Sequence, residues 1–96
     1  MRSAMSEGKL MPDTTELLQQ GIALVKAGRR EEARAILLKV IEQDEQNESA
    51  WLWLSGVVDG EDDKAVALEN VLTLNPNNEW AKRGLQMLSR PLPKVE

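Results

Sequence analysis

The chain has 96 residues, 42% of them hydrophobic and 29% charged, with a net charge of −4 and neither cysteine nor histidine. This size fits one small domain, and the composition excludes disulfides, thiolate metal sites and the commonest general base, while the negative charge disfavours nucleic-acid binding. No apolar run reaches the roughly 18–20 residues of a membrane span, so we expect a cytoplasmic protein with no membrane, metal or cofactor partner.

The two ends of the chain carry weak structural signals. Residues 1–12 have no sustained periodicity and end in a proline, and residues 91–96 contain two prolines, which cannot continue a helix. Both segments are predicted to be flexible tails, and the ordered domain is predicted over 13–90.

The first half of this domain predicts two helices. Asp13 can cap a helix, with Glu16 three positions later, and Gly28 can end it. The second helix follows, with acidic residues in its first turn, which suits the helix dipole. Its apolar stripe consists of Ala33, Ile36, Leu37, Val40 and Ile41.

The second half predicts three more helices. Asn47 can cap a third helix over about 48–58, and the break 58–63 precedes a fourth. The segment 75–78, Asn-Pro-Asn-Asn, separates the fourth helix from a fifth over 78–89. The apolar residues that mark the fourth helix are Val66, Leu68, Val71 and Leu72, and those expected to face inward in the fifth helix are Ala81, Leu85 and Leu88.

The helices repeat along the chain. Leu17-x-x-Gln20-Gly21-x-x-Leu24 in the first helix corresponds to Trp51-x-x-Leu54-Ser55-x-x-Val58 in the third, at an offset of 34 residues. From the second helix to the fourth, and from the third to the fifth, the offset is 31. A helical hairpin of this size cannot bury its own apolar face, so such units stack into one continuous core.

This pattern resembles the tetratricopeptide repeat, a helix–turn–helix of 34 residues with the motif W-x₂-L-G-x₂-Y…A-x₃-F…P. Repeat one covers 14–47, a shortened repeat two covers 48–78, and the helix 78–89 caps the stack; Lys64 falls where the repeat has a small alanine, with Ala65 beside it. The resemblance implies an all-α, right-handed superhelix of two antiparallel helical hairpins plus a C-terminal capping helix, five helices in total. Its repeat positions here are Leu17, Gly21, Leu24, Ala33, Leu37, Trp51, Leu54, Val58, Leu68 and Pro76.

Chemistry-bearing motifs are scarce. Counted from Asp59, the acidic segment 59–63 is followed by no glycine at the sixth position and no glutamate at the twelfth position of a calcium loop, so it is interpreted as a helix-initiating turn. The basic cluster that includes Arg30 and Arg34 is surrounded by carboxylates, which favours a solvated surface. We expect no enzyme; an enzyme acting through Lys64 and nearby carboxylates is a remote alternative.

The resemblance therefore implies a non-catalytic module that binds a partner helix or peptide in a concave groove formed by the first helix of each unit. Some family members hold a C-terminal carboxylate there, but Leu18, Ile22 and Trp53 replace the required polar residues, and only Arg83 has suitable chemistry. Two alternatives stay open: a homodimer whose groove is its own interface, and a closed groove in which Trp53 and Trp80 cover each other. The groove residues are Leu18, Ile22, Leu52, Trp53, Trp80, Arg83 and Met87.

Overall fold

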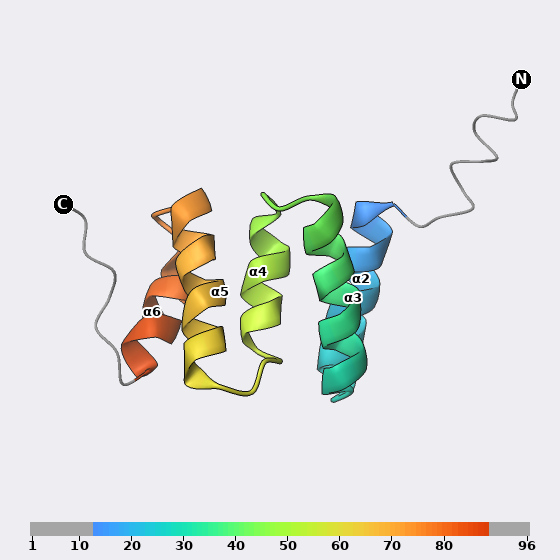
Figure 1. Ribbon diagram of the computed structural model, residues 1–96, viewed down its shortest axis with the longest axis horizontal. Coiled ribbons are helices and arrows are strands. Elements are labelled where there is room, and N and C mark those ends of the chain that lie inside the picture. Colours follow the sequence, from blue (N-terminus) through green and yellow to red (C-terminus); the bar gives the residue numbers. More distant parts are fainter. Residues whose placement is uncertain (1–12, 89–96) are drawn as a thin grey trace, which may run out of the picture.

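The computed structural model describes residues 13–88, which form five helices and no strand. The helices are α2 (Thr14–Lys26), α3 (Arg30–Gln43), α4 (Glu48–Ser55), α5 (Glu61–Leu74) and α6 (Glu79–Met87). Consecutive helices run in opposite directions, and α2 and α6 lie behind α3 and α5 in Figure 1, with α4 between the two pairs. The all-α prediction is confirmed for these residues. The predicted tails, 1–12 and 91–96, and residues 89–90 of the predicted domain lie outside the described part of the chain.

Local capping explains why α2 and α3 begin and end where they do. The carboxylate of Asp13 accepts the N–H of Glu16 at 2.8 Å, which satisfies a free donor at the start of α2. At the other end Gly28 has a φ of +81°, and the N–H groups of Gly28 and Arg29 donate to Val25 and Leu24. This left-handed glycine reverses the chain, so α3 starts two residues later and packs antiparallel on α2.

The third helix is shorter than the sequence predicts. It was expected to reach 58, but α4 ends at Ser55, where the N–H groups of Gly56 and Val57 donate to carbonyls three residues back and tighten the last turn. Val58, expected to be a helical repeat position, therefore lies in the loop, half-buried against the core below α4.

One apolar residue of α5 lies outside the core. Val66, which helps to mark this helix in the sequence, is 51% exposed. The buried side of α5 is centred on Leu68, and residues two apart on a helix point about 200° apart, so Val66 projects from the opposite side. Ala65 and Ala67 are buried instead.

The interior consists of two clusters that one side chain joins. The first contains residues of α2, α3 and α4 and of the loop after α4, and the second contains residues of α5 and α6. Trp51 is half-buried, packs against both clusters, and donates its indole N–H to the Glu45 carbonyl at 2.9 Å. Among the repeat positions, Leu17, Gly21, Ala33, Leu37, Leu54 and Leu68 are buried, Leu24, Trp51 and Val58 are half-buried, and Pro76 is exposed.

The turns after α3 and α5 make the same hydrogen bonds. Each begins with a residue whose side-chain oxygen accepts the N–H two positions later, and each ends with an asparagine that caps the next helix. The first members are Asp44 and Asn75, both 3.1 Å from the nitrogen; the caps are Asn47 and Asn78, at 3.0 and 2.9 Å from the nitrogens of Ala50 and Ala81. These two turns are 31 residues apart, so the sequence repeat is also a repeat of local structure.

Candidate functional site

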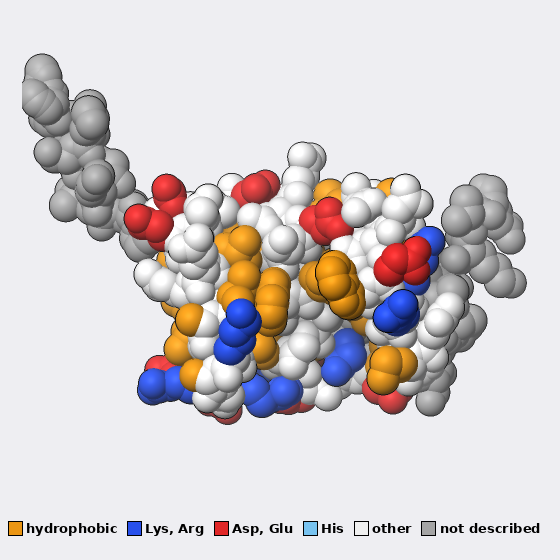
Figure 2. Space-filling model, turned by 180° about the vertical axis from the view of Figure 1, so that it is seen from behind, with side chains coloured by type: hydrophobic (Ala, Val, Ile, Leu, Met, Phe, Trp, Pro, Cys, Tyr) orange, Lys and Arg blue, Asp and Glu red, His pale blue; other side chains and the backbone are white. Residues whose placement is uncertain are grey.

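A cleft of about 350 Å³ opens between α4 and α6, with α5 beneath it. We call it the α4–α6 cleft. Two of its apolar residues are unusually exposed, Trp80 at 71% and Met87 at 86%. Figure 2 shows hydrophobic side chains in separate patches on this side of the molecule, with Lys and Arg side chains among them. The lining consists of Leu52, Ser55, Gly56, Lys64, Leu68, Trp80, Gly84, Met87 and Leu88.

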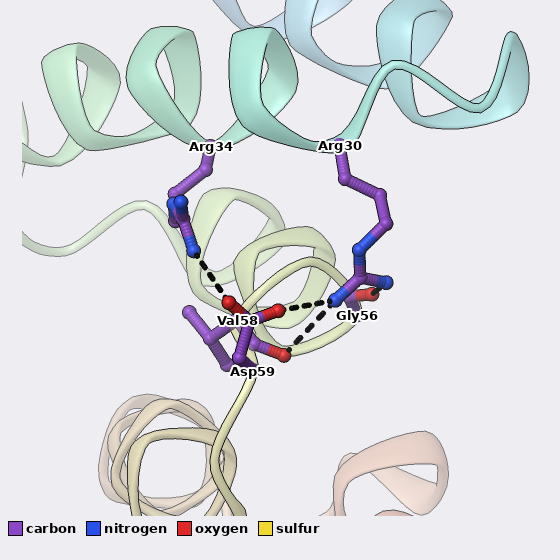
Figure 3. Close-up of polar contacts among 5 residues, drawn as sticks. All are labelled: Arg30, Arg34, Gly56, Val58 and Asp59. Carbon is purple, nitrogen blue, oxygen red and sulfur yellow. Dashed lines mark hydrogen bonds and ion pairs between the residues drawn. The ribbon is translucent and has the colours of Figure 1, made fainter.

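An arginine of α3 holds the loop that follows α4 (Figure 3). The Arg30 guanidinium donates to the carbonyls of Gly56 and Val58 at 3.2 and 3.3 Å, and to the Asp59 carboxylate at 3.1 Å. Arg34 approaches the other oxygen of Asp59 at 3.6 Å. The hydrogen bond from Arg30 and the charge of Arg34 hold the pKa of Asp59 below its ordinary value. These arginines hold the loop from the surface, since the Arg30 side chain is 51% exposed and that of Asp59 is 80% exposed, which agrees with the predicted mixed-charge surface.

The shortness of α4 leaves room for the cleft. α4 has 8 residues where α2 has 13, and the chain leaves the helix at Gly56. Gly56 leaves space in the lining, since a Cβ atom there would meet only the Trp53 carbonyl oxygen at 3.5 Å, whereas at Gly84 it would lie 2.8 Å from Leu68, so α6 packs closely on α5 at that point. The Ser55 hydroxyl donates to the Leu52 carbonyl at 2.6 Å, so it makes its hydrogen bond within α4.

A second, polar pocket adjoins the first. We call it the turn pocket; its volume is about 450 Å³, and Trp80 lines both spaces. On its wall, Glu48 accepts hydrogen bonds from the side-chain amides of Asn75 at 2.9 Å and Asn78 at 2.5 Å. These hydrogen bonds lower the pKa of Glu48, and the one from Asn78 has the larger effect. The carboxylate thus connects the start of α4 to the turn between α5 and α6. Arg83 also lines the turn pocket.

The predicted groove is divided in the structure. Leu52, Trp80 and Met87 meet in the α4–α6 cleft, and Arg83 lies in the adjoining turn pocket.

The other three predicted groove residues, Leu18, Ile22 and Trp53, line neither space. Leu18 and Trp53 pack, half-buried, against the first core cluster, because α4 contacts α2 there and their side chains fill the space. Ile22 is half-buried on α2. Since Trp80 is 71% exposed, the alternative in which the indoles of Trp53 and Trp80 cover each other is wrong.

Several lining residues were not predicted as site residues. Leu68 was assigned only to the core, Gly84 was not singled out, and Lys64 was noted as a mismatch to the repeat and as the remote catalytic alternative. That mismatch was the available signal, since a lysine in place of a buried alanine must find an open space for its charge. The structure places Lys64, half-buried, in the wall of the cleft.

Comparisons with known proteins and a survey for other site types complete the description. Within residues 13–88, no helix has the length and apolar character needed to cross a membrane, and no three acidic side chains are grouped as metal ligands. No protein-family model matches the sequence, and comparisons with curated proteins and with solved structures find no match.

Proposed function

We propose that this protein is a non-catalytic interaction module that binds a short peptide or helix of a partner protein in the α4–α6 cleft. The observation that carries the proposal is the pair of exposed large apolar side chains, Trp80 and Met87, in the wall of a concave apolar space. Exposed apolar surface of this kind marks interaction sites, and aromatic anchors supply much of the binding energy at interfaces. Methionine adapts its shape to different partners.

The same proposal includes a tetratricopeptide-like, right-handed stack of two hairpins and a capping helix. Two features support it. The first residues of α2 and α4 are 34 positions apart, while those of α3 and α5, and of α4 and α6, are 31 apart, as in the sequence repeat. The turns that begin at Asp44 and Asn75 share their hydrogen bonds. In such a stack the first helices of the units line the binding face.

A selection from a library of random peptides tests the binding function. Peptides enriched on the wild-type protein are expected to lose at least about tenfold in affinity for Trp80→Ala/Met87→Ala, the loss typical of hot-spot truncation. The matched control is Leu38→Ala/Val66→Ala, which removes two exposed apolar side chains outside the cleft, 44% and 51% exposed. Enriched peptides that bind both double variants equally well would contradict the proposal.

Sedimentation of the purified chain tests the homodimer alternative. A monomer is expected up to high micromolar concentration. A dimer that dissociates in Trp80→Ala/Met87→Ala, but persists in Leu38→Ala/Val66→Ala, would show that a second copy occupies the cleft and would overturn binding of a separate partner.

A further inference from the structure

The positive charge in the wall of the α4–α6 cleft belongs to Lys64, which is not needed for the packing of the second hairpin. Ala33, at the corresponding position of the first hairpin, is completely buried. In the second hairpin Ala65 takes that role with no exposed surface, and Lys64 beside it lines the α4–α6 cleft. Within residues 13–88, Lys64 has no ion pair with a carboxylate. The half-buried side chain of Lys64 therefore borders an apolar space, and its ammonium group has no counter-ion from the described structure.

The other charged residues near the cleft also leave a positive charge without a carboxylate partner. Arg83 is exposed in the turn pocket on the far side of Trp80, and it too has no carboxylate partner among residues 13–88. Two carboxylates line that pocket, but each already has a partner. Glu48 is held by two asparagine amides, and Glu79 lies 3.9 Å from the Lys82 ammonium. The first-turn carboxylates of α5, residues 61–63, do not line either space.

We propose that the partner segment is acidic: a bulky apolar side chain enters the cleft beside Trp80 and Met87, and an adjacent aspartate or glutamate pairs with Lys64. This inference rests on the proposed function and specifies its partner. A bound segment would cover the apolar space beside Lys64, and an ion pair at the edge of a covered apolar surface is screened less by water than a fully exposed pair is. Charge complementarity of this kind selects partners and excludes basic segments.

The size of the cleft favours a short segment over a second copy of the chain. Nine residues line about 350 Å³, which accommodates one or two side chains of an extended peptide or helical turn. A stable protein–protein interface buries about 800 Å² on each partner and involves about 20–30 residues a side.

The test uses the full chain and the random peptide library, and it reads both sequence and affinity. Peptides selected on the wild-type protein are expected to contain an excess of aspartate and glutamate next to a large apolar residue. Lys64→Glu is expected to weaken their binding about tenfold, and selection on Lys64→Glu/Arg83→Glu is expected to enrich basic peptides instead. Lys39→Glu, at an exposed position of α3 outside the cleft, is the charge-matched control and should leave affinity unchanged. Circular dichroism confirms that each variant is folded.

The outcomes separate this inference from the proposed function. Selected peptides that require Trp80 and Met87 but show no acidic excess, and that bind Lys64→Glu as tightly as wild type, overturn the acidic partner and leave the binding function intact. Failure to select any peptide that depends on Trp80 and Met87 overturns both, as does a dimer formed through the cleft.

Discussion

The position that a Cβ atom would take on Gly21 lies 2.8 Å from Cδ2 of Leu37 and 2.9 Å from its Cγ. Carbon atoms that are not bonded do not come this close, so α2 and α3 reach their separation because residue 21 has no side chain. Leu37 is completely buried and cannot move aside freely.

Gly21→Ala is therefore expected to destabilise the fold. Overpacking of a filled core costs about 1–3 kcal/mol, and the better helix propensity of alanine offsets about 1 kcal/mol, so a net loss of about 1–2 kcal/mol is expected. Urea unfolding followed by far-UV circular dichroism measures it. Gly56→Ala is the control, since its Cβ would meet only the Trp53 carbonyl oxygen at 3.5 Å; equal stability of both variants would contradict the close approach.

Replacement of Trp51 and replacement of Trp80 by alanine should change the stability of the fold by very different amounts. Trp51 packs against both core clusters and donates its indole N–H to the Glu45 carbonyl. Trp51→Ala is therefore expected to lower the free energy of unfolding by about 3–5 kcal/mol, enough to threaten a domain of this size. Trp80→Ala removes a side chain that is 71% exposed and should change stability by less than about 0.5 kcal/mol. Urea midpoints distinguish the two, and a large loss for Trp80→Ala would place its indole in the core.

The hydrogen bonds to Glu48 predict a specific dependence of stability on pH. Because they lower its folded-state pKa, its contribution is complete above the unfolded-state pKa of about 4.3 and disappears as the pH falls through the lower folded-state value. Wild type is therefore expected to lose more stability on acidification than Glu48→Gln. Urea unfolding at a series of pH values from about 6 to 2 measures the difference.

A second variant sharpens this test. Asn75→Ala removes one of the two amide donors, so its pH dependence should fall between those of wild type and Glu48→Gln. Parallel pH profiles for all three proteins would show that the Glu48 carboxylate does not connect α4 to the turn between α5 and α6 in solution.

Filling the cleft from one side should block binding without unfolding the protein. Gly56 has a φ of −86°, which any residue can adopt, and it lines the cleft. Gly56→Leu is expected to reduce peptide affinity about tenfold, the effect of occluding a hot-spot pocket. Gly60→Leu adds the same side chain in the same loop but outside the cleft, and it should bind as wild type does. Isothermal titration with a selected peptide compares them, and an unaffected Gly56→Leu would place the site elsewhere.

The helix boundaries could largely be predicted because their causes are local. Asp13, Gly28, Asn47 and Asn78 each act on backbone groups within a few residues, so their effect is visible in the sequence. The early end of α4 has no comparable local signal, and the loop that follows it is held by Arg30, which donates to carbonyls 26 and 28 residues away. Such contacts depend on how the hairpins stack, which the periodicity of one helix does not specify.

The candidate site was predictable only in part for a related reason. α4 has apolar residues on almost every side, so its sequence does not indicate which of its tryptophans and leucines is covered by a neighbour. Packing against α2 half-buries Trp53, while the space before α6 leaves Leu52 beside a cleft. Trp80 and Met87 could be placed away from the core because α6 has few apolar residues, and its inward side is already occupied by Ala81 and Leu85.

The matching turns after α3 and α5 also make this chain extendable. A copy of residues 48–78 inserted directly after Asn78 would begin behind an asparagine cap and end with one, so both junctions would keep the hydrogen bonds already present at Asn47 and Asn78. The lengthened protein would contain two successive copies of α4 and α5 before the terminal helix. Its affinity for a tandem peptide could then be tuned by the number of inserted units, without redesign of any contact inside a unit.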